Sequence, residues 1–145
     1  MIPVAEVSID AALVRTLLEQ QAPHLATLEL RPAAAGWDNQ MFRLGPELAV
    51  RLPRRAAAVP LLLNEASWAA SLAARLPLPV PVPVFTGAPG AGYPFPWLVT
   101  NWLDGEPATG LSATQRDGYA AGLAAFLAAF HSPLGAADAP VNDFR

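Results

Sequence analysis

The chain has 145 residues, of which 53% are hydrophobic and 14% are charged, with 9 basic side chains against 12 acidic ones. The net charge of −3 and the lack of a long basic cluster argue against a DNA or RNA partner. The chain contains no cysteine, which excludes disulfides and thiolate chemistry. Its apolar runs are too short to span a bilayer and no secretory signal opens the sequence, so we expect a cytoplasmic protein without a membrane partner.

The first part of the chain is predicted to form one helix and three strands. Ser8 is in a position to cap a helix over Ile9 to Gln21, whose leucines recur at helical spacing. Three extended segments are predicted next, at residues 28–31, 40–44 and 48–52. The segment Gly45-Pro46-Glu47 joins the last two strands, which indicates a hairpin.

The second part of the chain alternates helices with strands. A helix is predicted over residues 60–76, because proline is tolerated in a first turn and Pro77 stops the far end. The segment Leu76 to Val84 alternates proline with aliphatic residues, which favours an edge strand over about 82–86. A buried strand is predicted over 97–102, and the whole pattern indicates an α+β fold with an antiparallel sheet.

The last predicted helix is apolar on nearly all sides. Ser112 and Gln115 have the spacing of a capping box, and the helix should continue to His131. A helix of this composition needs other structure to cover it. We therefore expect the chain to self-associate through residues 112–131 or to be poorly soluble.

Arg51 and Glu65 are the first candidate site residues. The hairpin should place Arg51 at the centre of the sheet, and a buried arginine and a buried glutamate require each other. In a nucleotide-binding site this pair would hold the guanidinium against phosphates. The alternative is that Arg51 lies exposed on an edge and Glu65 is a solvated helix residue; the spacing alone leaves both open.

Two loops supply the other candidates. Gly36, Asp38 and Asn39 lie between predicted strands, where turn conformations leave backbone amides free to face phosphate. The alternative is an ordinary hairpin loop with Trp37 packed over the sheet. Residues Asn101, Trp102 and Leu103 end a buried strand, where main-chain groups could meet an adenine edge or could simply be a strand terminus.

The residues alone predict neither a catalytic centre nor a metal site. His24 and His131 have no metal-ligating partner at a helical or hairpin spacing. The chain contains no P-loop, G-x-S-x-G, H-E-x-x-H or G-x-G-x-x-G motif.

Taken together and in this order, six segments resemble the N-terminal half of the aminoglycoside phosphotransferase family. These segments are residues 36–45, 48–55, 64–65, 76–83, 92–97 and 102–106. Members of that family have a protein-kinase-like fold and move a phosphoryl group from a nucleoside triphosphate to a small-molecule hydroxyl. The resemblance implies a five-stranded N-terminal lobe with flanking helices over residues 1–103, a connector over 104–111, and the first helix of an incomplete helical lobe over 112–145.

The resemblance also implies roles for the candidate residues. Arg51 stands where the family commonly has a phosphate-binding lysine, and this chain has no lysine at all. Glu65 is its ion-pair partner, and residues 36–40 form the loop over the phosphates. Residues 101–103 are the hinge whose backbone meets the base of ATP or GTP.

What the resemblance leaves out is the chemistry. The family's catalytic H-G-D-x-x-x-x-N segment does not occur before Arg145, so the chain alone is predicted inactive. Magnesium and the small-molecule acceptor are expected only with the helical lobe. Two other functions stay open: a non-catalytic binding or dimerisation module derived from a kinase lobe, and an interaction module that presents the proline-rich stretch 77–83.

Overall fold

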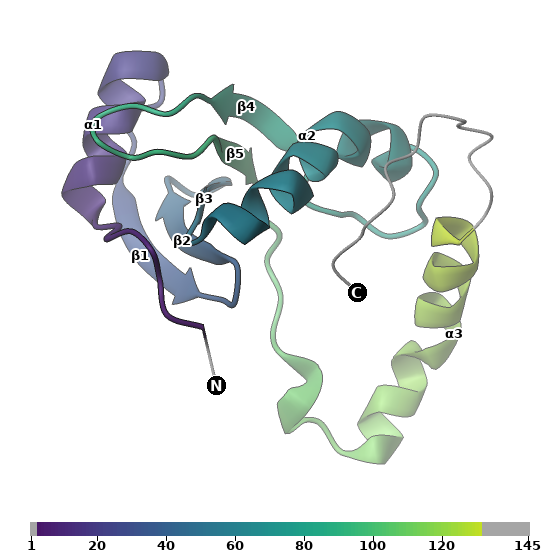
Figure 1. Cartoon of the computed structure of the whole chain (residues 1–145). Coiled ribbons are helices and arrows are strands. Elements are labelled where there is room, and N and C mark those ends of the chain that lie inside the picture. The colour runs from purple at the N-terminus through teal and green to yellow at the C-terminus, as the bar shows by residue number, and fades with distance from the viewer. Residues whose placement is uncertain (1–2, 132–145) are drawn as a thin grey trace.

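The computed structural model describes residues 3–131, which form a five-stranded sheet, two helices packed on it and a third helix apart from it (Figure 1). The elements in chain order are α1 (Ala11–Gln21), β1 (Leu30–Ala35), β2 (Asn39–Leu44), β3 (Leu48–Pro53), α2 (Val59–Ala73), β4 (Pro83–Gly87), β5 (Trp97–Asn101) and α3 (Ala113–Phe130). Single 3₁₀ turns precede α2 and α3. Residues 132–145, the remainder of the predicted last domain, lie outside the described residues.

The sheet is antiparallel throughout, with the strand order β1-β2-β3-β5-β4. The predicted five-stranded antiparallel sheet is therefore confirmed. β2 and β3 form the predicted hairpin, and Gly45 in its turn has a φ of +60°, a conformation that favours glycine. β3 lies at the centre of the sheet because β5 pairs with its other side.

The two faces of the sheet carry different residues, because side chains alternate along each strand. One face forms the core with α1 and contains Phe42, Leu44, Val50, Leu52, Trp97 and Val99 together with Val14, Leu17 and Leu18 of the helix. The residues between them in sequence belong to the opposite face; these are Met41, Arg43, Ala49, Arg51, Leu98 and Thr100. This second face carries Arg51, the charged candidate residue of the sheet.

The N-terminal cap of α1 differs from the prediction. Asp10 is the cap, and its carboxylate accepts a hydrogen bond of 2.8 Å from the backbone N–H of Leu13. Ser8 lies two residues too early to cap this helix. Ile9 packs against the core instead of entering the helix, so the chain turns into α1 only after Asp10.

Both ends of β1, the end of β5 and the end of α2 also differ from the prediction. β1 spans Leu30–Ala35 rather than 28–31, since Leu28 is held in a turn by the carbonyl of Leu25 at 3.1 Å. The alanines that follow have little strand propensity of their own and extend only because they pair with β2. α2 ends at Ala73, before the predicted end at residue 76, and β5 ends at Asn101 rather than at Trp102.

The proline-rich segment leads into β4, which is an edge strand as predicted. Val82 exchanges hydrogen bonds with Asn101: its carbonyl accepts from the backbone N–H of Asn101 at 3.2 Å, and its own N–H donates to the Asn101 side chain. The end of the stretch 77–83 is thus used inside the fold. This finding weighs against its display as a ligand for another protein.

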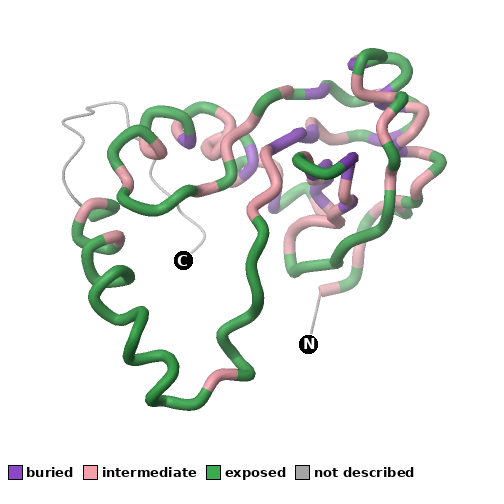
Figure 2. Tube along the Cα trace, turned by 180° about the vertical axis from the view of Figure 1, so that it is seen from behind, coloured by how far each residue is buried: buried purple, intermediate pink, exposed green. Residues whose placement is uncertain are grey.

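α3 has the predicted capping box, in which the side chains and backbones of Ser112 and Gln115 bond reciprocally. It ends at Phe130, with His131 as its C-terminal cap residue. None of its residues is buried by the described part of the chain, and it is exposed along almost its whole length (Figure 2). No helix within residues 3–131 has the length and hydrophobicity needed to cross a membrane.

Candidate functional site

A cavity of about 370 Å³ lies where the second face of the sheet meets the start of the connector, which in the structure comprises residues 102–112 between β5 and α3. Its lining comes from β2, β3, β5, the proline-rich segment and the connector, and consists of Met41, Ala49, Arg51, Pro81, Thr100, Asn101, Trp102 and Leu103. This volume is within the usual range of small-molecule sites. The cavity therefore joins Arg51 to the three connector candidates.

Arg51 lies in the central strand, between Met41 on β2 and Leu98 on β5. Its Nη1 donates a hydrogen bond to Oε1 of Glu65 on α2, and the two side chains are 18% and 27% exposed. The alternative of an edge arginine and a solvated glutamate is wrong. One strand and one helix, 14 residues apart in sequence, together build a partly buried ion pair.

The pair leaves the guanidinium with binding capacity. A guanidinium has five N–H donors in a planar fork, and the bond to Glu65 uses one of them. Arg51 also lines the cavity, so its charge faces a space that a ligand could enter. A carboxylate that fixes one side of the fork directs the other side, which is an arrangement suited to phosphate oxygens.

The three connector residues differ in what they offer a ligand. The side chain and backbone N–H of Asn101 are bonded to Val82, and the backbone N–H of Trp102 donates to the carbonyl of Glu47 at 2.7 Å. The N–H of Trp102 is therefore already bonded within the fold. Leu103 lines the cavity and makes no hydrogen bond within residues 3–131, so its main chain is available.

The loop candidates lie beyond the end of this cavity. Gly36 accepts a hydrogen bond of 2.8 Å from Arg54 through its carbonyl, and Asp38 pairs with Arg55 at 3.0 Å. Asn39 is the first residue of β2 and lies opposite Pro53. None of Gly36, Asp38 and Asn39 is among the residues that line the cavity.

Trp37, at the tip of the same loop, is 61% exposed. The alternative in which Trp37 packs over the sheet is therefore wrong. Two arginines that follow β3 hold the residues on either side of it, and most of Trp37 stays exposed in the described chain.

Four lining residues were not predicted from the sequence: Met41, Ala49, Pro81 and Thr100. Period-two alternation identifies two of them, because Ala49 lies two residues before Arg51 and Met41 is the cross-strand partner of Arg51. Thr100 lies opposite Ala49 on the neighbouring strand and is 1% exposed. Its position follows only from the pairing of β3 with β5, which no local pattern reveals.

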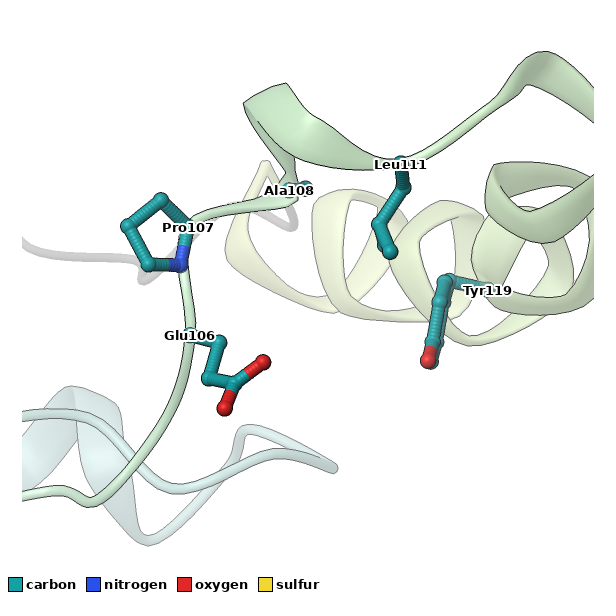
Figure 3. A pocket seen from close by; sticks show the side chains of 5 residues that line it. All are labelled: Glu106, Pro107, Ala108, Leu111 and Tyr119. Carbon is teal, nitrogen blue, oxygen red and sulfur yellow. The ribbon is translucent and has the colours of Figure 1, made fainter.

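A second hollow, of about 360 Å³, lies between the connector and α3. Figure 3 shows the carboxylate of Glu106 and the ring of Tyr119 on opposite sides of it, with Leu111 between them. Its walls are mostly exposed side chains. Within residues 3–131 no three histidine or acidic residues gather in a metal-binding group, so neither hollow is a candidate metal centre.

Residues 29–145 match the phosphotransferase enzyme family. The match covers most of the chain, and the protein therefore belongs to this family. No curated protein matches the chain significantly.

Solved structures that share this fold include aminoglycoside phosphotransferases. The GDP complex of wild-type aminoglycoside 2'-phosphotransferase-IIIa superposes with a TM-score of 0.77 at 17% identity, covering 88% of this chain and 44% of that one. The gentamicin complex of APH(2")-IIa gives 0.67 at 23% identity, covering 94% and 46%. The streptomycin–ATP complex of APH(2")-IIa gives 0.60 at 22% identity, covering 88% and 41%.

At these identities the likeness establishes the fold, which is that of the N-terminal lobe of such enzymes. The chain spans less than half the length of each of the three structures.

Proposed function

We propose that this chain is the nucleotide-binding half of a phosphotransferase that uses ATP or GTP and acts on a small-molecule hydroxyl. The observation that carries the proposal is a cavity lined both by Arg51, which is ion-paired with Glu65, and by Leu103. Arg51 offers the cavity a directed positive charge, and Leu103 offers it unbonded backbone groups. A nucleotide presents phosphates and a base edge that need these two kinds of partner.

In this proposal each residue has a distinct task. Arg51 binds phosphate oxygens and Glu65 holds the guanidinium in direction. The backbone of Leu103 bonds the base, while Asn101 and Trp102 position it. Gly36, Asp38 and Asn39 belong to a loop that lies over the phosphates. Its support is the anchoring by Arg54 and Arg55; Asp38 balances the charge of Arg55, and Arg54 adds a positive charge beside the loop.

The solved relatives include complexes with GDP and with ATP, and their titles also name gentamicin and streptomycin. Those ligands belong to those proteins, and the proposal for this chain covers either nucleotide and any small-molecule hydroxyl. No H-G-D-x-x-x-x-N segment occurs in the 145 residues. We therefore propose that magnesium and acceptor are held by a helical lobe and that this chain alone does not turn over.

The test is calorimetric titration of the chain with ATP, GTP and GDP. Arg51→Met should weaken binding by about tenfold or more, since a hydrogen bond to a charged group is worth about 1.5–3 kcal/mol. Arg51→Lys restores the residue type common in the family and should keep most of the affinity.

Arg75→Met is the matched control, because it removes the same charge from an exposed position after α2. It should leave the affinity unchanged. A wild-type chain that binds none of the three nucleotides at millimolar concentration, or an Arg51→Met variant that binds as well as wild type, would contradict the proposal.

The dimerisation module is the second candidate, and α3 is the observation that favours it. Tyr119, Leu123, Leu127 and Phe130 are spaced along one side of the helix and are 65%, 54%, 42% and 46% exposed. A continuous apolar stripe of this kind is typical of an interface. Self-association of residues 112–131 would cover it.

Light scattering at increasing concentration tests this candidate. A dimer that Leu123→Glu converts to a monomer would support it, and a wild-type chain that stays monomeric at high concentration would contradict it. Nucleotide binding by both the wild-type chain and Leu123→Glu would show that nucleotide binding and dimerisation are separable.

A further inference from the structure

Arg43, Trp102 and Asp104 form a compact cluster at the point where β5 leaves the sheet. The guanidinium of Arg43 lies over the Trp102 ring, 4.4 Å from its centroid, and its Nη1 is 3.4 Å from Oδ1 of Asp104. The same carboxylate oxygen accepts a hydrogen bond of 2.9 Å from the indole N–H of Trp102. Each of the three side chains thus contacts both of the others.

Main-chain bonds attach this cluster to the β2–β3 turn. Arg43 donates from Nε to the carbonyl of Gly45 at 3.3 Å and from Nη2 to the carbonyl of Pro46. Trp102 donates its backbone N–H to the carbonyl of Glu47 at 2.7 Å. The rigid hairpin at the centre of the sheet therefore holds the start of the connector.

Leu103 lies between the two connector residues of the cluster. The N–H of Asn101 points to Val82 and that of Trp102 to Glu47, on opposite sides, as in an extended chain. Continuing this alternation directs the main chain of Leu103 away from Glu47, toward the side where Pro81 lines the cavity. Proline has no N–H to offer the Leu103 carbonyl, and the N–H of Leu103 makes no hydrogen bond within residues 3–131, so both groups are left for a ligand.

We propose that Arg43 is a positioning residue for the nucleotide base: through Trp102 and Asp104 it fixes the direction in which Leu103 presents its backbone to the cavity. The proposal rests on the proposed function. Arg43 is suited to this task because it lies on the cavity face of β2, opposite Ala49, which lines the cavity. Asp104 and the indole keep its charge on the connector.

A purely structural role for Arg43 would require its ion pair with Asp104 to contribute to global stability. Asp104 has an 88% exposed side chain, and exposed ion pairs contribute little to global stability. Loss of Arg43 should therefore loosen the connector without unfolding the sheet.

The experiment compares wild type, Arg43→Met, Arg43→Lys and the control Arg75→Met by amide hydrogen exchange and by titration with ATP and GDP. In Arg43→Met we expect exchange at the Trp102 amide and indole to rise about fivefold, with nucleotide affinity falling by about the same factor. The Leu17 and Leu18 amides in α1 should keep their protection. Arg43→Lys retains a cation over the ring and should recover part of both effects, and Arg75→Met should show neither.

Unchanged exchange at Trp102 in Arg43→Met, or faster exchange with unchanged nucleotide affinity, would overturn the positioning role while leaving the proposed function intact. Faster exchange at Leu17 and Leu18 as well would assign Arg43 to global stability and overturn it too. A wild-type chain that binds neither nucleotide would overturn the proposed function, and with it the task assigned to Arg43, whatever the exchange data show.

Discussion

The Arg51–Glu65 pair should contribute measurably to stability as well as to ligand binding. The perturbation is a double-mutant cycle built from Arg51→Met, Glu65→Met and the variant that carries both. Methionine keeps an unbranched side chain at each position and removes the charge. Removing one partner leaves the other partly buried without its counter-charge, whereas removing both leaves no charge to satisfy.

The magnitude follows from the exposure of the two side chains. Loss of one partner of a fully buried pair costs about 3–5 kcal/mol, and exposed pairs are worth about 0.2–1 kcal/mol. With 18% and 27% of the side chains exposed, this pair lies between those limits, and we expect each single variant to lose about 2 kcal/mol. For a domain of this size that loss corresponds to a fall of roughly 6–10 °C in Tm.

The assay is urea denaturation of wild type, the two single variants and the double variant, monitored by circular dichroism and by tryptophan fluorescence. The double variant should lose clearly less stability than the two single losses combined, giving a coupling energy of about 1–2 kcal/mol. Coincident transitions from the two probes would justify a two-state treatment.

A coupling energy below about 0.3 kcal/mol would refute this reasoning, because independent sites add to within that margin. It would mean that the two charges meet without stabilising each other. The proposal that Glu65 holds the Arg51 guanidinium in direction would then have no support from the stability measurements.

Three further predictions concern the scaffold. Burial raises the pKa of Tyr93 above its ordinary value of 10.0, so the unfolded phenol loses its proton first and stability should fall as the pH rises above about 10; Tyr93→Phe should flatten that decline in a pH series of urea denaturations. A Cβ on Gly87 would lie 2.0 Å from Cε2 of the fully buried Trp97, and Gly87→Ala should cost about 3 kcal/mol or prevent soluble expression. Asp10→Ala should cost about 1 kcal/mol through loss of the helix cap, while Ser8→Ala should change thermal stability by less than a few tenths.

Local patterns in the sequence were sufficient for most of the elements. The capping box at Ser112 and Gln115 was confirmed because both partners lie within one helical turn. The hairpin was predictable because alternation on both sides of Gly45 needs only neighbouring residues. The cap at Asp10 was missed because Ser8 satisfies the same local rule, and only the packing of Ile9 against the core decides between them.

The sequence by itself determined the antiparallel α+β class and the family resemblance. It left the pairing of Arg51 with Glu65 open as one of two readings. The tertiary structure decided between those readings, because the position of Arg51 at a centre or an edge depends on whether β5 pairs with β3. It also brought Arg43 to Asp104, which is 61 residues later in the chain. Contacts of that separation come from the order of strands in the sheet, and no spacing along the chain records it.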